Sequence, residues 1–216
     1  MKKKVGLFFG TFNPIHVGHL IIANHLAEHS DLEEVWMVVT PHNPHKKKKT
    51  LLDDIHRLAM VRIAIEDYPK LQASNIEFDL PQPNYTVNTL AVLEEKHPEL
   101  EFCLIMGEDN LKSLHKWKNY EVILERFAIY VYPRVIENTS KIPPSVPPQG
   151  GKPVKSNFSL EGNLLPENGK KITKIDAPIV EISSTFIRKN IASGNNIRPM
   201  LPKNVWEYLD EMNFYK

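Results

Sequence analysis

Two kinds of apolar pattern alternate along this chain. Short continuous apolar runs are typical of buried strands, and apolar residues that recur at helical spacing are typical of helices. Strands are predicted at Val5–Phe9, Glu34–Thr40, Ala73–Phe78, Glu101–Met106, Phe127–Tyr132 and Thr173–Ile182. Helices are predicted at Val17–Glu28, Asp53–Glu66, Val87–Lys96, Glu121–Glu125, Ser184–Ser193 and Pro202–Met212. This alternation predicts a parallel sheet with helices on both of its faces.

Residues at the ends of two helices support these assignments. Thr86 is a candidate N-cap for the helix that begins at Val87. Ser183 or Ser184 caps the later helix, and Gly194 ends it.

The predicted fold class is α/β: a Rossmann-like open, mainly parallel sheet whose ligands bind beyond the carboxyl ends of the strands. One segment interrupts the pattern, because residues 135–171 contain paired prolines, paired glycines and little periodicity. Such a segment is either a long excursion from one domain or a linker between two domains. Because Thr173–Ile182 is too short to begin a second core, we expect residues 1–216 to form a single domain.

Composition narrows the classes of function. The chain has 216 residues and a formal net charge of +1, so we do not expect it to bind nucleic acid through bulk positive charge. No apolar run approaches the ~18 residues of a membrane span, and the run after Lys2–Lys4 stops at Gly10, too early for a signal peptide. Cys103 is the single cysteine, which excludes an intramolecular disulfide and is typical of a reducing cytoplasm.

The segment Gly10–His19 joins the first predicted strand to the first predicted helix. His16 and His19 share one face close to the helix start, where free N–H groups form an anion site. Two imidazoles there can donate hydrogen bonds to a phosphate during its transfer. We expect Gly10 to permit unusual backbone geometry and Gly18 to leave room for a ligand. The simpler interpretation is a turn glycine and two partly exposed histidines.

A second candidate, Ile182–Arg188, opens a helix after a strand. Ser183, Ser184 and Thr185 supply hydroxyls, and Arg188 lies about one turn into the helix. Hydroxyls, free amides and a guanidinium together suit a triphosphate. An ordinary N-cap cluster with a surface arginine is the alternative.

Two further candidates supply phosphate or carboxylate donors. Lys46 follows the second strand within Pro44-His45-Lys46 and is a candidate phosphate ligand, although the lysines after it are typical of a solvated loop. Tyr85 and Thr86 precede a helix and could hold a small anion or merely cap the helix.

Asp109 and Trp117 are candidates for contacts with a nucleoside. An acidic residue after a strand, as in Gly107–Asn110, can bind ribose hydroxyls, and a loop tryptophan can stack on a heteroaromatic ring or pack in the core. The candidates therefore place phosphate donors after the first and last strands of the chain, and ring or ribose groups after the middle strands. Walker A and G-x-G-x-x-G motifs are absent, which argues against a P-loop kinase and a standard dinucleotide dehydrogenase.

These motifs match those of a known family. The pair Gly10–His19 and Ile182–Arg188 resembles the nucleotidyltransferases that carry an H-x-G-H signature. Further segments are similar to bacterial nicotinate-nucleotide adenylyltransferases: Pro44–Lys46, Tyr85–Leu90, Gly107–Asp109 and His115–Trp117. The resemblance spans nearly the whole chain apart from residues 135–171.

The resemblance implies adenylyl transfer from ATP to nicotinate mononucleotide, giving deamido-NAD and pyrophosphate in NAD biosynthesis. Mg²⁺ would be bound mainly through the ATP phosphates, with no protein metal site, and a homo-oligomer is compatible with the family. The implied catalytic residues are His16, His19 and Arg188. The implied ATP-binding residues are Gly10, Thr11, Phe12, His16, His19, Gly107, Asp109, Ser183, Ser184, Thr185 and Arg188. The implied mononucleotide-binding residues are Asn13, Lys46, Tyr85, Thr86, Trp117 and Arg134.

Two positions depart from the family pattern: Asn13 and Asn88 stand where Asp is frequent, which leaves fine specificity open. One alternative is an adenylyltransferase that acts on nicotinamide mononucleotide or pantetheine phosphate. Tyr85-Thr86 and Trp117 suit a flat acidic ring and argue against pantetheine phosphate. The other alternative is a non-catalytic nucleotide-binding regulator. The intact histidines argue against this alternative.

Overall fold

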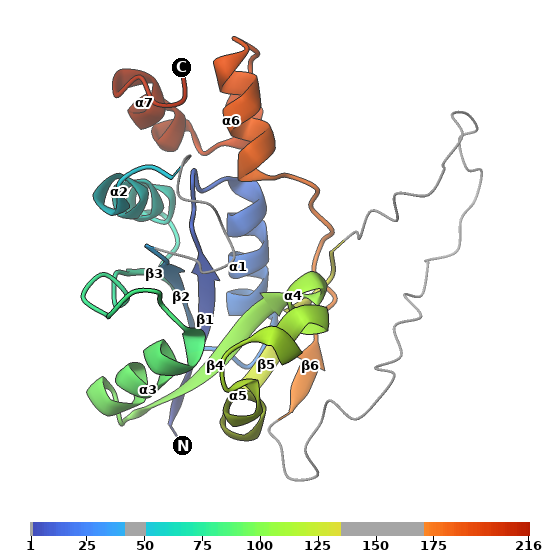
Figure 1. Cartoon of the computed structure of the whole chain (residues 1–216). Helices are drawn as coiled ribbons and strands as arrows, with labels where there is room; N and C mark the ends of the chain where they lie inside the picture. Colours follow the sequence, from blue (N-terminus) through green and yellow to red (C-terminus); the bar gives the residue numbers. More distant parts are fainter. Residues whose placement is uncertain (1, 42–50, 135–170) are drawn as a thin grey trace, which may run out of the picture.

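The computed structural model describes residues 2–41, 51–134 and 171–216. A six-stranded parallel sheet with the order β3-β2-β1-β4-β5-β6 forms its centre (Figure 1). The strands are β1 (Lys3–Gly10), β2 (Glu34–Val39), β3 (Leu71–Ser74), β4 (Leu100–Gly107), β5 (Ala128–Tyr132) and β6 (Ile172–Lys174). The predicted α/β, Rossmann-like fold class is confirmed. Strand order reverses between β1 and β4, which is where such sheets bind ligands.

Helices cover both faces of the sheet (Figure 1). The α-helices are α1 (Val17–His29), α2 (Asp54–Ala64), α3 (Thr86–Lys96), α4 (Glu108–Ser113), α5 (Tyr120–Arg126), α6 (Ser184–Ala192) and α7 (Lys203–Glu211), and the short 3-10 helices are η2 (Leu114–Lys116) and η3 (Arg198–Met200). One buried cluster joins the sheet to α1, α2, α6 and α7, and another joins it to α3, α4 and α5. Along β1, Val5 and Leu7 enter the second cluster and Phe8 enters the first, as the pleat of a strand requires.

Two predicted strands are shorter or displaced in the structure. The strand predicted at Ala73–Phe78 ends at Ser74, because the chain then turns and the Phe78 N–H donates to the Asn75 carbonyl at 2.9 Å. The strand predicted at Thr173–Ile182 is confined to β6, and residues 175–183 cross the molecule without regular structure. The helix α4 was not predicted, since six residues are too few to display a helical period.

The predicted helix ends are right at one helix and wrong at another. Ser183 is the N-cap of α6, where its hydroxyl accepts the Phe186 N–H at 3.2 Å, and Gly194 follows the helix with φ of 70°. At α3 the expectation that Thr86 is the cap is wrong: Thr86 is the first helical residue, and Tyr85 precedes it without a side-chain cap.

The prediction of a single domain stays a prediction, and residues 135–170 of the expected excursion lie outside the described residues.

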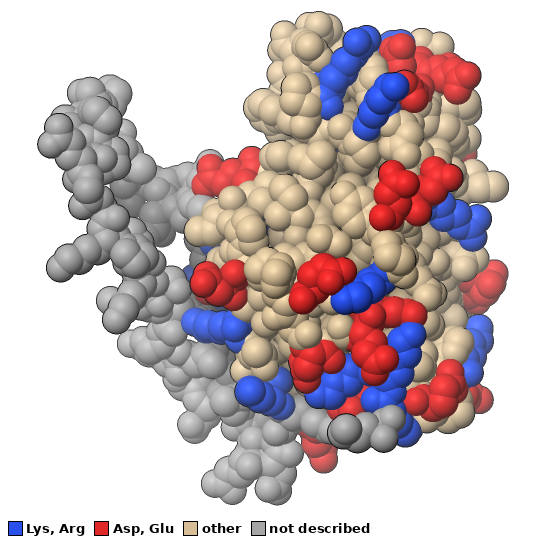
Figure 2. All heavy atoms as spheres, turned by 180° about the vertical axis from the view of Figure 1, so that it is seen from behind, with Lys and Arg blue, Asp and Glu red and all other residues tan. Residues whose placement is uncertain are grey.

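The face of the molecule opposite to the view of Figure 1 carries positive and negative side chains interspersed with each other (Figure 2). This pattern agrees with the net charge of +1. None of the helices that the structure describes has the length and apolarity needed to cross a membrane.

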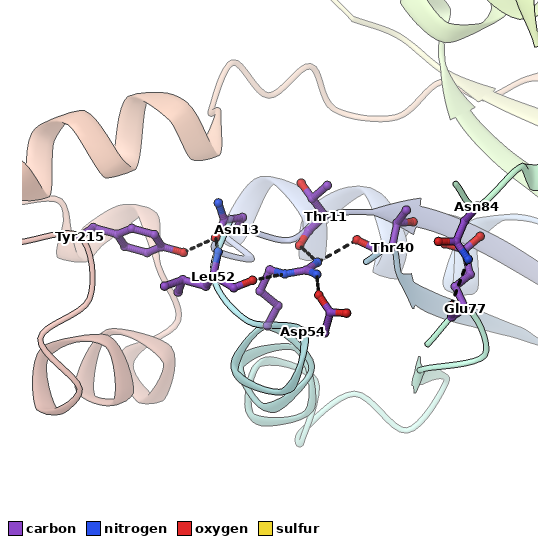
Figure 3. A network of polar contacts seen from close by, with 9 residues as sticks. Thr11, Asn13, Thr40, Leu52, Asp54, Glu77, Asn84 and Tyr215 are labelled. Carbon is purple, nitrogen blue, oxygen red and sulfur yellow. Dashed lines mark hydrogen bonds and ion pairs between the residues drawn. The ribbon is translucent and has the colours of Figure 1, made fainter. Parts of the chain in front are cut away.

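Arg57 holds the loop after β1 against the end of β2 and the start of α2 (Figure 3). Its guanidinium is fully buried and donates to three backbone carbonyls: Leu52 at 2.9 Å, Thr11 at 2.7 Å and Thr40 at 2.9 Å. The same group forms an ion pair with Asp54. Because three separate segments supply these acceptors, one side chain fixes their relative positions.

We predict that Arg57→Met destabilises the fold by about 3–5 kcal/mol, the cost of breaking a buried charged network by removing one partner. The three carbonyls would lose their donor while staying close to the core. Equilibrium unfolding in urea measures the change. The control is Arg126→Met, since Arg126 pairs with Glu94 at the surface and its loss should cost at most about 1 kcal/mol. A loss at Arg57 no larger than that of the control would contradict the structural role.

Candidate functional site

A cleft of about 1170 Å³ lies at the carboxyl ends of the central strands. This volume exceeds the ~300–1,000 Å³ of most small-molecule sites. The cleft brings together most of the residues singled out in the sequence: Gly10, Thr11, Phe12, Asn13, His16, Gly18, His19, Tyr85, Thr86, Asp109, Trp117, Arg134, Ser183, Ser184, Thr185 and Arg188. Gly107 does not line it, and Lys46 lies outside the described residues.

His16 and His19 lie one over the other at the start of α1. Their rings stack with centroids 3.7 Å apart and planes at 24°. The His16 backbone N–H donates to Nδ1 of His19 at 3.2 Å. A neutral imidazole that accepts at Nδ1 carries its proton on Nε2. His19 therefore offers an N–H donor, as the stabilisation of a phosphate requires.

His16 is only 4% exposed, and its Nδ1 has no hydrogen-bond partner among the described residues. Burial, with a smaller contribution from the positive charge of Arg134, lowers the pKa of His16 to about 4. The imidazole is thus neutral at pH 7.

The glycines of this loop serve close packing, and their expected roles need correction. A Cβ on Gly10 would lie 2.8 Å from the Phe12 ring, and it is Phe12, with φ of 43°, that takes the left-handed conformation. A Cβ on Gly18 would lie 3.0 Å from Val180 Cγ1 and 3.1 Å from His16 Nδ1. The space at Gly18 is therefore filled by protein side chains and does not leave room for a ligand, contrary to the expectation from the sequence.

The start of α6 is bonded directly to the loop after β1. The Ser184 hydroxyl donates to the Pro14 carbonyl at 2.9 Å. Arg188 donates to the Asn13 carbonyl at 2.7 Å and to Thr185 Oγ1 at 3.2 Å. These bonds bring residues about 170 positions apart in the sequence to one wall of the cleft. The hydroxyls and the guanidinium predicted to suit a triphosphate lie together there, beside the two histidines.

The opposite wall of the cleft holds the start of α3 and the turn after η2. Because no side chain caps α3, its first backbone N–H groups remain available to an anion. Lys118 Nζ lies 4.5 Å from the centre of the Tyr85 ring and adds positive charge. Trp117 is half-buried in the same wall and packs in part against the core. This arrangement suits a flat ring that carries a negative group.

Asp109 and Arg134 form an ion pair in the cleft, with Arg134 Nη1 2.8 Å from Asp109 Oδ2. Asp109 Oδ1 is buried and has no hydrogen-bond partner among the described residues. A Cβ on Gly107 would lie 2.5 Å from that oxygen, so Gly107 acts by giving room to the carboxylate. Gly107 itself does not line the cleft, and its expected contact with adenosine stays a prediction.

Two buried polar residues of the cleft were not assigned a role from the sequence, Glu77 and Asn84 (Figure 3). Glu77 was missed altogether, whereas Asn84 begins the candidate segment that contains Tyr85 and Thr86. Glu77 is 2% exposed, accepts the Thr89 hydroxyl at 2.6 Å and has a second carboxyl oxygen without a partner among the described residues. Burial raises its pKa. Asn84 donates to the Glu77 carbonyl at 3.0 Å. Nothing in the local sequence identifies Glu77 as a residue of the site. Its partners belong to other parts of the fold, and the sequence around it is typical of an ordinary strand.

The fold and the site together define a class of protein. Residues 7–190 match the model of the cytidylyltransferase-like family, and the chain belongs to that family.

Two individual relatives match the chain over almost its full length. A protein of Christiangramia forsetii, named probable nicotinate-nucleotide adenylyltransferase, is 63% identical over 216 residues, which cover all of both chains. A protein of Flavobacterium psychrophilum with the same name is 62% identical over 213 residues, 99% of each chain.

A solved structure shares the fold. Plasmodium falciparum nicotinic acid mononucleotide adenylyltransferase complexed with NaAD superposes with a TM-score of 0.71. The two chains are 19% identical, and the likeness covers 99% of this chain and 97% of the other.

We predict that the His16 side chain stays neutral in the free protein down to about pH 5 and takes up a proton with a midpoint near 4. The unfolded chain would bind this proton near the ordinary value of 6.5, so the contribution of His16 to stability declines as pH falls from about 6.5 toward 4. NMR of the imidazole, assigned with a His16→Asn variant, measures the titration. A midpoint above 6 would contradict the neutral buried state.

Proposed function

We propose that this chain transfers the adenylyl group of ATP to the phosphate of nicotinate mononucleotide, which gives deamido-NAD and pyrophosphate in NAD biosynthesis. One observation carries the proposal: a single cleft gathers the histidines of α1 and the hydroxyls and Arg188 of α6 on one wall, and the uncapped start of α3 and Trp117 on another. The names of relatives more than 60% identical over the full chain support the same reaction.

The reaction is one displacement at phosphorus. An oxygen of the mononucleotide phosphate attacks the α-phosphorus of ATP, the bond to the bridging oxygen of the β-phosphate breaks, and pyrophosphate leaves with the electron pair. The attacking phosphate is already an anion at neutral pH, so no general base is needed. The protein contributes alignment of the two substrates and compensation of charge.

The residues of the α1 and α6 wall face the phosphates in this proposal. His19 donates from Nε2 to the transferred α-phosphate, and its stacking with His16 fixes the plane of the ring. Arg188 lies against the same loop and compensates charge toward the β- and γ-phosphates. Thr11 and Ser183 border this part of the cleft and complete the ATP site.

Mg²⁺ enters with ATP in this proposal. Among residues 2–41, 51–134 and 171–216, no three His, Cys, Asp or Glu side chains converge as a metal site. Each of the two cleft carboxylates has one oxygen bonded within the protein, Asp109 Oδ2 to Arg134 and Glu77 Oε1 to Thr89. These residues fit an ion held by the ATP oxygens and water. When bound, the ion offsets negative charge on the phosphates.

The α3 wall accounts for the choice of the second substrate. The carboxylate of nicotinate matches the free amides and the positive end of α3 and the nearby charge of Lys118. The amide of nicotinamide would turn N–H donors toward these donors. Each mispaired buried polar group costs about 1–3 kcal/mol. Lys46 would pair with the mononucleotide phosphate, at a position outside the described residues.

We predict that nicotinate mononucleotide is preferred over nicotinamide mononucleotide by at least roughly a hundredfold in kcat/KM, since a polar site rejects a mismatched analogue strongly. Release of pyrophosphate from ATP with each mononucleotide, and with pantetheine phosphate, measures the preference. Trp117→Ala should weaken both pyridine substrates equally, because stacking does not distinguish the ring substituent. Comparable kcat/KM values would indicate dual specificity, and no turnover of any substrate would indicate a non-catalytic nucleotide binder.

We predict that His19→Ala lowers kcat by about two to three orders of magnitude, the loss typical of one removed donor to a developing charge. The control is His25→Ala, which removes an imidazole from the same helix where it packs against His29 and does not line the cleft. The control variant should keep the kcat of the unmodified enzyme. Similar kcat values for the two variants would remove His19 from the mechanism.

A further inference from the structure

The segment that follows α7, residues 212–216, returns to the loop after β1. Asn213 and Tyr215 have φ of 54° and 65°, a left-handed conformation that is uncommon for residues other than glycine. Such a conformation persists where the surrounding packing determines it. The result is that the Tyr215 side chain points at Asn13 (Figure 3).

Aromatic packing on α2 holds this segment in place. The Phe214 ring lies 4.8 Å from the His56 ring, edge to face, and the Phe214 N–H donates to the Leu209 carbonyl at 3.0 Å. These contacts fix the position of residues 212–216 where the segment approaches the cleft.

Asn13 is the point at which four segments of the chain meet. The Tyr215 hydroxyl donates to its Oδ1 at 2.6 Å, and the Leu52 N–H donates to the same oxygen at 3.2 Å. Arg188 donates to its backbone carbonyl at 2.7 Å. Asn13 is 2% exposed and lies three residues before His16, so a shift of Asn13 would move the histidine pair and the guanidinium together.

The Tyr215 hydroxyl is protonated and so remains a hydrogen-bond donor. Burial raises the pKa of Tyr215, although the positive charges of Arg188 and Arg57 act in the opposite direction. The hydroxyl can therefore hold the Asn13 amide oxygen throughout the neutral range.

We propose that Tyr215 is a positioning residue for adenylyl transfer: its bond to Asn13 fixes the loop that presents His16 and Arg188 to the ATP phosphates. The proposal rests on the proposed function. Tyr215 does not line the cleft, so it acts through Asn13 and not by touching substrate.

The test compares Tyr215→Phe with Tyr208→Phe, which removes the hydroxyl bonded to His56 in the same aromatic cluster. Tyr215→Phe should lower kcat about tenfold and change the KM of nicotinate mononucleotide less than about twofold, because a small misplacement of the loop affects the transferring phosphate most. Tyr208→Phe should leave kcat unchanged even where it lowers Tm equally. Equal kcat for the two variants would overturn the proposal.

Two further measurements separate positioning from stability. On an Asn13→Ala background, Tyr215→Phe should lower kcat no further, since the partner is already lost. Amide hydrogen exchange of residues 11–16, without substrates, should accelerate in Tyr215→Phe and not in Tyr208→Phe. Additive losses of kcat or unchanged exchange would contradict the role of Tyr215. Because exchange needs no turnover, it decides the question even if the unmodified protein fails to release pyrophosphate.

Discussion

The fold of the cleft depends on one buried guanidinium. Arg57 binds the carbonyls of Thr11, Thr40 and Leu52, which belong to three segments that no regular secondary structure joins at this point. A buried cation is costly unless every donor finds an acceptor, so its network accepts few alternative arrangements. Helices and sheet bring these segments near one another, and Arg57 fixes the loop from which the phosphate site is built.

The cleft combines buried neutral groups with positive charge at its margins. His16 is held neutral by burial, while Arg134, Arg188 and the uncapped start of α3 place positive charge at the cleft. This division suits a reaction between two phosphates: donors fixed in place stabilise charge where it develops, without the reorganisation that water would need.

The sequence predicted the parts of the molecule that local patterns determine. Continuous apolar runs predicted β1, β2, β4 and β5, and Ser183 was recognised as a cap because capping is a contact between near neighbours in the chain. Most residues of both walls were identified as polar residues at the starts of predicted helices. The strand at β3 was displaced, because its end depends on a turn whose residues carry no strong turn signal.

The connections within the site could not be predicted in the same way. Arg57, Glu77 and Tyr215 each bond to a residue far away in the sequence: Thr11 lies 46 positions from Arg57, Thr89 lies 12 from Glu77, and Asn13 lies 202 from Tyr215. Nothing in their immediate sequence distinguishes them from surface residues. The role of Gly18 was predicted wrongly for the same reason: contacts with distant residues cannot be recognised from the local sequence. The atoms that crowd Gly18 include the side chain of Val180.

In the proposed reaction the cleft only aligns the two substrates and compensates charge, and no covalent intermediate forms on the protein. The stereochemical course at the α-phosphorus distinguishes this direct transfer from a covalent route, when the ATP carries one sulfur of known configuration on the α-phosphate. A single in-line displacement predicts inversion of configuration in the dinucleotide product. Retention would require two successive displacements through an adenylylated side chain and would contradict the account.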